Sequence, residues 1–400
     1  MRTILFVDDQ REILNSHREG MKKFHGQVDT HFTAGAEAAL ELLKTTPIDV
    51  VVTDMHMPGM DGATLLGRIK EDYPDIVRLM LCPQTQTDTF FVALPVSHQV
   101  LAKPLNPDLL CNAIDRIFRL RDLLTDSLRK KIGGVKQLPS VPTVYLEMMS
   151  TMERPDASAT KIARILERDT AMAAKTLQLV NSAIFSLPRQ ITSLDQAVAY
   201  LGMELIRDLS LTVHMFAALE PTAIRSGFSF NAEQRHSLMT AKIAKRLITG
   251  QRLAQNAFTA GLLHDIGKLV MAVCIPEQFK EVRKICKTTG RASHEVESEL
   301  LGVTHAEVGA YLLSLWGLPH SIVEAVAYHH NPSAALEKTF DLPTAVSLAN
   351  ALVDEITSKR PFTLEEHLNT LDVMDRLPRW RTIAQQELQP VKPEFVGARS

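Results

Sequence analysis

The chain has 400 residues, of which 45% are hydrophobic and 22% are charged. That length is too great for one compact core, and the ordinary composition argues against disorder, so we expect two or three globular domains. Forty-four basic residues against 46 acidic residues give a net charge of −2. This balance argues against a general electrostatic attraction to nucleic acid or to an anionic membrane.

Cysteine usage and the apolar segments indicate where the protein resides. The acids within the first ten residues do not fit a secretory signal. The longest apolar stretch is interrupted by His264, Asp265 and Lys268, which argues against a transmembrane helix. Four scattered cysteines form no CxxC pair and fit a reducing cytosol: Cys82, Cys111, Cys274 and Cys286. We therefore expect a cytoplasmic protein without membrane insertion.

The first 125 residues alternate between short apolar runs and helical patterns. The segments TILFVDD and IDVVVTD are rich in β-branched residues and end on acids, and GAEAALELLK between them has helical spacing. Two further apolar runs, IVRLMLC and HQVLAKPL, follow along the chain. This alternation predicts an α/β fold with a doubly wound parallel sheet.

Acidic residues fall at the ends of the predicted strands. Asp8, Asp9 and Asp54 should converge, because functional residues gather at the carboxyl ends of parallel strands. Close carboxylates repel one another unless a cation joins them, and oxygen ligands suit Mg²⁺. Lys103, at another strand end, adds a positive charge that would help to neutralise an incoming phosphoryl group. A lone acid is usually a solvated loop residue, but this combination favours Asp54 as a nucleophile that forms an acyl phosphate.

Residues 1–122 resemble the receiver domain of response regulators, on the motifs VDD, DMHMPGMDG and KP in order. The resemblance implies a five-stranded sheet, Asp54 as phospho-acceptor, a cis Lys103–Pro104 bond and a sensor histidine kinase as partner. Two positions depart from the family. Cys82 stands where receivers carry Ser or Thr, and Val100 where they carry Tyr or Phe. A thiol is a weak donor and valine is no aromatic switch, so we expect altered signal transmission. A receiver driven by protein contacts alone is the alternative.

The segment after residue 107 connects the two halves of the chain. Its apolar residues recur at helical spacing: Leu110, Ile114, Ile117, Leu124 and Leu128. We expect the first part to pack on the sheet as the last receiver helix, and residues 123–136 to form a helical linker. This linker either packs elsewhere or pairs with a second copy as a short coiled coil, which would make a homodimer.

From Val141 onward the pattern is almost entirely α-helical, and its histidines are the informative residues. A single histidine is more often a satisfied interior or surface residue than a ligand. Several imidazoles with a carboxylate suit Zn, Fe or Mn, and an open metal position can activate water for phosphoester hydrolysis. Gly267 would let a neighbouring helix or ligand approach the backbone closely. The residues of this candidate set come from several helices or helix ends: His236, His264, Asp265, His305, His329 and His330.

Residues 137–335 resemble the HD superfamily and, within it, the HDOD output domains. The resemblance rests on LPSVP, LVNSAIFSLPRQITSLDQAVAYLG, GLLHDIGKL and GVTHAEVGAYLLSLWGLPHSIVEAVAYHHNP. It implies a metal set of His236, His264, Asp265 and a later Asp. The later position aligns with Asn350, and the sequence leaves open whether Asp354, one turn on, points to the same place.

HD-GYP enzymes, which hydrolyse cyclic di-GMP, are the catalytic relatives to weigh against this interpretation. They use further histidines that resemble His305, His329 and His330, but NPSAALEK follows here in place of their Gly-Tyr-Pro signature. An amide at position 350 removes a negative charge from the metal shell, which would weaken metal binding. HDOD domains are regarded as non-catalytic signalling modules, and the departure at Asn350 agrees with that view.

We therefore predict a two-component response regulator. Phosphorylation of Asp54 would control a non-catalytic HDOD domain that binds a downstream signalling protein or a ligand. The alternative is a metal-dependent HD-type phosphodiesterase that acts on a cyclic dinucleotide or another nucleotide. DNA binding is not expected, because the chain has no basic recognition helix. Residues 336–400 are predicted to add C-terminal helices that pack on the HDOD core.

Overall fold

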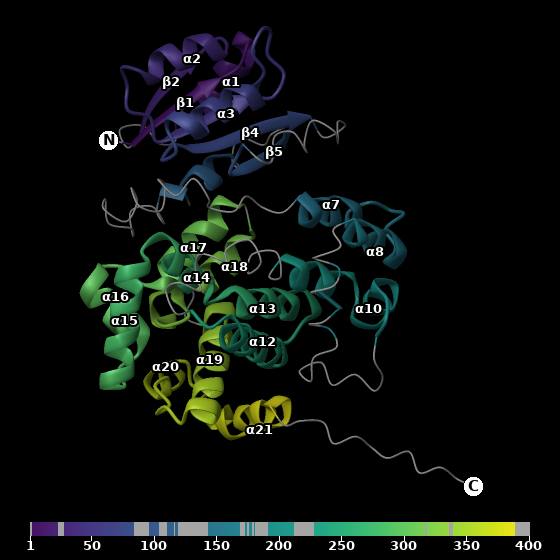
Figure 1. Ribbon diagram of the computed structural model, residues 1–400, viewed down its shortest axis with the longest axis vertical. Helices are drawn as coiled ribbons and strands as arrows, with labels where there is room; N and C mark the ends of the chain where they lie inside the picture. Colours follow the sequence, from purple (N-terminus) through teal and green to yellow (C-terminus); the bar gives the residue numbers. More distant parts are fainter. Residues whose placement is uncertain are drawn as a thin grey trace. The chain divides into compact units, whose positions relative to one another are not determined.

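The computed structural model describes most of the chain. The described residues are 2–22, 28–83, 96–103, 110–115, 117–118, 143–168, 173, 176–177, 180, 191–211, 228–316, 318–335 and 339–388. They divide into two compact units, the first containing the N-terminal sheet and the second most of the residues from 144 onward. Figure 1 shows the helices and strands of both units with their labels.

The first unit is built on a parallel sheet of five strands in the order β2-β1-β3-β4-β5. This confirms the α/β class predicted from the sequence. Val7 pairs with Thr33 and with Thr53 on its two sides, and Asp54 pairs with Leu81, so the carboxyl ends of the strands lie along one edge. The strands are β1 (Arg2–Val7), β2 (Val28–Thr33), β3 (Val50–Asp54), β4 (Val77–Pro83) and β5 (Gln99–Lys103).

Helices connect these strands, and their apolar faces complete the core of the first unit. The helices are α1 (Arg11–Met21), α2 (Ala36–Leu43) and α3 (Gly62–Asp72). Leu65, Leu66 and Ile69 of α3 are fully buried, because their spacing places them on one face of the helix. A Cβ atom at Gly62 would lie 2.0 Å from the carbonyl oxygen of Asp54. Glycine therefore allows α3 to begin against the end of β3.

The segment expected to form the last receiver helix is described in part. Residues 110–115 and 117–118 are helical, and the apolar residues among them are buried: Leu110, Ile114, Ile117 and Phe118. Pro104 and residues 119–142 lie outside the described residues. The cis Lys103–Pro104 bond, the helical linker 123–136 and the coiled-coil homodimer therefore stay predictions.

The second unit is α-helical, as the sequence predicts. Its first helices are α7 (Thr143–Met152), α8 (Ala159–Glu167), α10 (Leu194–Leu201), α12 (Phe230–Leu247), α13 (Gln251–Leu263) and α14 (Ile266–Cys274). The chain continues with α15 (Pro276–Thr289), α16 (Ser293–Leu301), α17 (His305–Leu315) and α18 (His320–Tyr328). Of these helices, residues 297–301 and 310–315 group with the first unit. The last elements are η3 (Pro332–Ala334), α19 (Leu342–Ser358), α20 (Glu365–Thr370), η4 (Met374–Arg376) and α21 (Leu377–Leu388).

Helices α12, α13 and α19 form the centre of this unit and pack on one another (Figure 1). The approach of α13 to α12 depends on Gly261, because a Cβ atom there would lie 2.7 Å from the Cα of Ala241. The C-terminal helix α21 packs against α12 and α19. These contacts bring together residues that are more than one hundred positions apart in the sequence.

The stretch Gln251–Cys274 is long and apolar enough to cross a membrane by composition alone. Within the described residues, 83% of its most apolar window is buried inside the protein. Buried core helices meet the same criteria of length and hydropathy, so this stretch is only weak support for a membrane span.

Candidate functional site

The carboxyl edge of the sheet brings together the acids and the lysine predicted for phosphoryl transfer. Asp8 and Asp9 follow β1 directly, Asp54 ends β3 and Lys103 ends β5. Carboxylate oxygens of the three aspartates lie within 4.8 Å of one another. The Nζ atom of Lys103 lies 2.7 Å from Oδ1 of Asp54 and 3.3 Å from Oδ2 of Asp8. Three oxygen donors at this spacing fit a hard cation such as Mg²⁺.

Burial sets the electrostatics of this site. Asp8 is 1% exposed, and desolvation raises its pKa above the usual value even though the Gln10 amide and Lys103 favour the charged form. The same effect raises the pKa of the Cys82 thiol to about 11, with the carboxylate of Asp54 adding to the shift. Cys82 is therefore a neutral thiol at ordinary pH.

The two departures from the receiver pattern lie on neighbouring strands. Cys82 is in β4 and is 2% exposed, and Val100 is in β5, where it pairs with Met80. Val100 is half-buried and packs against the apolar cluster that contains Cys82 and Met80. The position usually held by an aromatic switch is therefore filled here by a small core side chain.

The second unit gathers the predicted histidines around one aspartate. His264 and Asp265 form the turn between α13 and α14, not the interior of a continuous helix. His236 comes from α12 and His305 from the start of α17, and His329 follows the end of α18. All four imidazoles reach the carboxylate of Asp265, which is 3% exposed.

The two oxygens of Asp265 face different sets of nitrogen atoms. Oδ1 lies 3.0 Å from Nε2 of His305 and 3.7 Å from Nε2 of His329. Oδ2 lies 3.2 Å from Nε2 of His264 and 3.7 Å from Nε2 of His236. Two donor groups result. Each has its atoms within 4.8 Å of one another, and they share the aspartate: one is Asp265, His305, His329 and His330, and the other is His236, His264 and Asp265.

Backbone contacts orient two of these rings. Nδ1 of His264 donates to the carbonyl of Gly261 and Nδ1 of His329 donates to the carbonyl of Val326, both at 2.8 Å. The opposite nitrogen of each ring, Nε2, is buried and faces the carboxylate of Asp265 without a hydrogen bond of regular geometry. Oδ1 of Asp265 is buried in the same way. Orphaned acceptors around one point fit a bound cation, and a second hydrogen bond to backbone is typical of metal-binding histidines.

The packing of α14 on α17 fixes the distance between two members of the cluster. A Cβ atom at Gly267 would lie 1.9 Å from the carbonyl oxygen of His305 and 2.7 Å from the amide nitrogen of Gly309. The backbone of α14 therefore touches that of α17 two residues after Asp265. The close approach expected at Gly267 is made by a helix.

Asn350 lies on α19 and contacts the cluster at His236. Its Oδ1 atom is 2.8 Å from Nε2 of His236. Asp354, one turn later, lies on the other side of the same ring, with Oδ1 4.0 Å from Nδ1 of His236. Asp354 also forms an ion pair with Arg360. The carboxylate of Asp354 therefore does not take the place of an aspartate at position 350.

Three further residues belong to the cluster, although the sequence analysis did not assign them. Nζ of Lys268 lies 2.5 Å from Oδ2 of Asp265 and 3.1 Å from Glu233. His294 of α16 stacks on His330, with ring centroids 3.9 Å apart. The available signal for Lys268 and Glu233 was helical spacing, since they lie three residues after Asp265 and three before His236.

The buried charges shift the pKa values of the cluster. Burial by itself would raise the pKa of Asp265, but the neighbouring His264 and Lys268 hold it well below the usual value. Burial lowers the pKa of His329 and of His330 well below the ordinary range, and that of His236 to about 4. Asp265 is therefore ionised beside the neutral imidazoles of His236, His329 and His330, and neutral imidazole is the form that binds metals.

Comparisons with known proteins agree with this division. A model of the HDOD domain family matches residues 138–332, and a model of the response regulator receiver domain matches residues 4–115. The chain therefore carries an N-terminal receiver domain and a C-terminal HDOD domain. A solved HDOD domain protein of unknown function from Geobacter sulfurreducens is 26% identical, with a TM-score of 0.52, and the match covers 68% of this chain and 93% of that chain.

Two curated proteins match parts of this response regulator. The heme response regulator HssR of Staphylococcus aureus is 31% identical over 120 residues, which are 30% of this chain and 50% of HssR. An uncharacterized protein of Treponema pallidum is 28% identical over 240 residues, which are 60% of this chain and 46% of that protein. The chain spans about half the length of each of these two relatives.

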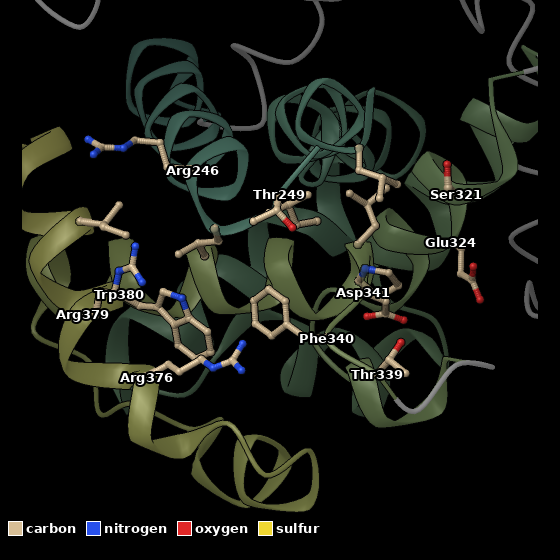
Figure 2. A pocket seen from close by; sticks show the side chains of 16 residues that line it. Arg246, Thr249, Ser321, Glu324, Thr339, Phe340, Asp341, Arg376, Arg379 and Trp380 are labelled. Atoms are coloured by element: carbon tan, nitrogen blue, oxygen red, sulfur yellow. The ribbon is translucent and has the colours of Figure 1, made fainter. Parts of the chain in front are cut away.

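Two cavities lie in the helical unit that contains the HDOD domain. One, of about 690 Å³, opens beside the histidine cluster, and its lining includes His236, His329, His330, Lys268 and Asn350. The other, of about 740 Å³, lies between α12, α18 and α21 (Figure 2). Phe340 and Trp380 stack in it with ring centroids 4.9 Å apart, and Figure 2 shows arginines around these rings. This second cavity contains no member of the histidine cluster.

Proposed function

We propose that this response regulator is phosphorylated on Asp54 and that its HDOD domain acts as an output module without turnover. A sensor histidine kinase would supply the phosphoryl group, since a receiver domain requires a phosphoryl donor. The output would be the binding of a downstream signalling protein or a ligand.

The contact between Lys103 and Asp54 supports the first part of the proposal. The carboxylate of Asp54 attacks the phosphorus atom and forms an acyl phosphate, while the donor's leaving group departs. Lys103, 2.7 Å from Oδ1 of Asp54, is placed to neutralise the phosphoryl oxygens. Mg²⁺, held by Asp8, Asp9 and Asp54, would supply the remaining positive charge at this site. Cys82 offers only a weak thiol donor where other receivers offer a hydroxyl.

The contact between Asn350 and His236 carries the second part. Asn350 is neutral, and its amide oxygen engages Nε2 of His236, the nitrogen that faces Asp265. Lys268 holds the oxygen of Asp265 on that side. This part of the cluster therefore lacks the closing carboxylate that a water-activating metal of the HD type would require.

Phosphorylation can be tested on the full chain with acetyl phosphate and Mg²⁺. Intact-mass measurement should show one added phosphoryl group on the wild type and none on Asp54→Asn. Asp72→Asn, an exposed acid on α3, is the matched control and should label normally. Equal labelling of Asp54→Asn and the wild type would refute the assignment.

A phosphodiesterase remains the second candidate because of the donor group around Asp265 and the cavity beside it. Lys268, Arg235 and Arg360 line that cavity and would suit phosphate oxygens. The full chain, loaded with Mn²⁺, Fe²⁺ or Zn²⁺ and assayed with cyclic di-GMP before and after phosphorylation, should show no product. Hydrolysis of cyclic di-GMP that disappears in His264→Ala would establish a phosphodiesterase. It would refute the proposal that the HDOD domain is a non-catalytic output module.

A further inference from the structure

We propose that the HDOD domain holds one metal ion rather than two. The ion would lie between Asp265, His305, His329 and His330, while Lys268 and Asn350 close the side that contains His236. The inference deepens the proposed function, on which it rests, because it names a ligand for the output domain.

The spacing of the four donors supports one site. Ligands held about 2.0–2.1 Å from a tetrahedral ion lie about 3.3 Å from one another. Nε2 of His305 lies 3.0 Å from Oδ1 of Asp265 and 3.0 Å from Nε2 of His330, and Nε2 of His329 lies 3.7 Å from the same oxygen. Three imidazole nitrogens and one carboxylate oxygen form a complete ligand set for Zn, Fe or Co.

The orientation of His329 favours the same point. Its Nδ1 atom donates to the carbonyl of Val326, so Nε2 carries the lone pair. That lone pair is buried without a hydrogen-bond partner, and Oδ1 of Asp265, buried beside it, faces the Nε2 atoms of His305 and His329. A cation between them would satisfy both atoms.

The other side of Asp265 is already neutralised by the protein. Nζ of Lys268 lies 2.5 Å from Oδ2, where its ammonium group would repel a second cation. Nε2 of His236 donates to the amide oxygen of Asn350, so it carries a proton there and offers no lone pair to an ion. Nε2 of His264 is then the remaining unpaired nitrogen of that donor group, and one nitrogen does not hold an ion.

The number of ions can be measured on full-length protein stripped of metal and titrated with Co²⁺. Millimolar Mg²⁺ fills the oxygen site of the receiver, so the intensity of the visible Co²⁺ bands reports nitrogen coordination in the HDOD domain. We expect one Co²⁺ per chain by metal analysis after gel filtration. His329→Ala should weaken binding at least tenfold, and the matched control His320→Ala, on the exposed side of α18, should not. Circular dichroism checks that both variants fold.

The double variant Asn350→Asp with Lys268→Ala provides the second measurement, since it restores the carboxylate and removes the repelling ammonium group without removing a ligand. We expect this variant to bind two Co²⁺ per chain. Zero or two ions in the wild type, or loss of the ion in His236→Ala but not in His329→Ala, would overturn the proposal. A wrong ion count with no nucleotide turnover would leave the proposed output function intact. Turnover would contradict that function whatever the count.

Discussion

Replacement of Gly62 by alanine tests whether a backbone contact holds the phospho-acceptor. Gly62 is the first residue of α3. A Cβ atom there would lie 2.0 Å from the carbonyl oxygen of Asp54 and 3.1 Å from the sulfur of Met80. The methionine side chain can rotate away, but the carbonyl belongs to a central strand that pairs on both sides. The substitution must therefore displace either the start of α3 or the end of β3.

The size of the effect follows from overpacking against backbone. Extra atoms in a well-packed core cost about 1–3 kcal/mol, and an immovable carbonyl places Gly62→Ala in the upper half of that range. Alanine regains up to about 1 kcal/mol of helix propensity in a helix interior, and less at the first turn. We expect the substitution to lower the free energy of unfolding of this part of the receiver by about 2 kcal/mol. That change corresponds to a roughly 30-fold increase in the equilibrium constant for opening.

Hydrogen exchange of the full-length protein, followed by mass spectrometry, measures this change in the peptides that cover β3 and β4. Gly67→Ala in the same helix is the matched control. A Cβ atom there would meet Val96 at 3.7 Å, an ordinary contact, so protection should stay equal or rise. If Gly62→Ala protects β3 as well as the wild type does, the close contact does not constrain Asp54 and the reasoning fails.

Three further predictions concern protonation and capping. Burial lowers the pKa of His17 to about 4, so below pH ~6.5 the unfolded chain binds a proton that the folded receiver excludes. Stability should therefore fall as the pH decreases from ~6.5 towards 4, and His17→Phe should flatten that slope in urea titrations. The carboxylate of Asp341 caps α19 by accepting from the Thr344 amide at 3.0 Å. Asp341→Ala should lower the free energy of unfolding by about 1 kcal/mol and Asp341→Asn by less, and equal losses would contradict a capping role. Cys82, with a pKa of about 11, should resist iodoacetamide at pH 8 in the folded protein and react after denaturation; rapid native labelling would show that the thiol is accessible.

The order of motifs along the chain was sufficient to predict the class of both units. The strand ends carry Asp8, Asp54 and Lys103, and parallel strands must place such residues on one edge of the sheet. That rule needs only the pattern of apolar runs. The sequence could also identify Asp265 and its histidines as a set, because each of them lies within a recognisable motif.

The finer arrangement of the histidine cluster depends on side-chain direction, which spacing alone does not determine. Asp354 and Asn350 are one turn apart on α19, yet Asn350 reaches the inner nitrogen of His236 and Asp354 reaches the outer one. Lys268 follows Asp265 by one turn, but its role depends on how α14 leaves the turn at His264. These directions are set by the packing of α12, α13 and α19, which comes from long-range contacts.

The contact between Gly267 and the carbonyl of His305 has a consequence for how a metal would be exchanged. Because contact between the two backbones sets the distance between α14 and α17, we expect the donors of Asp265 and His305 to keep their separation whether or not an ion is present. Metal binding would then be uncoupled from folding, unlike in small zinc domains that unfold without their ion. Binding at such a preorganised site costs little reorganisation energy. Its occupancy would then follow the free metal concentration, as in a metal sensor, and the fold would not depend on the ion as it does at a structural metal site.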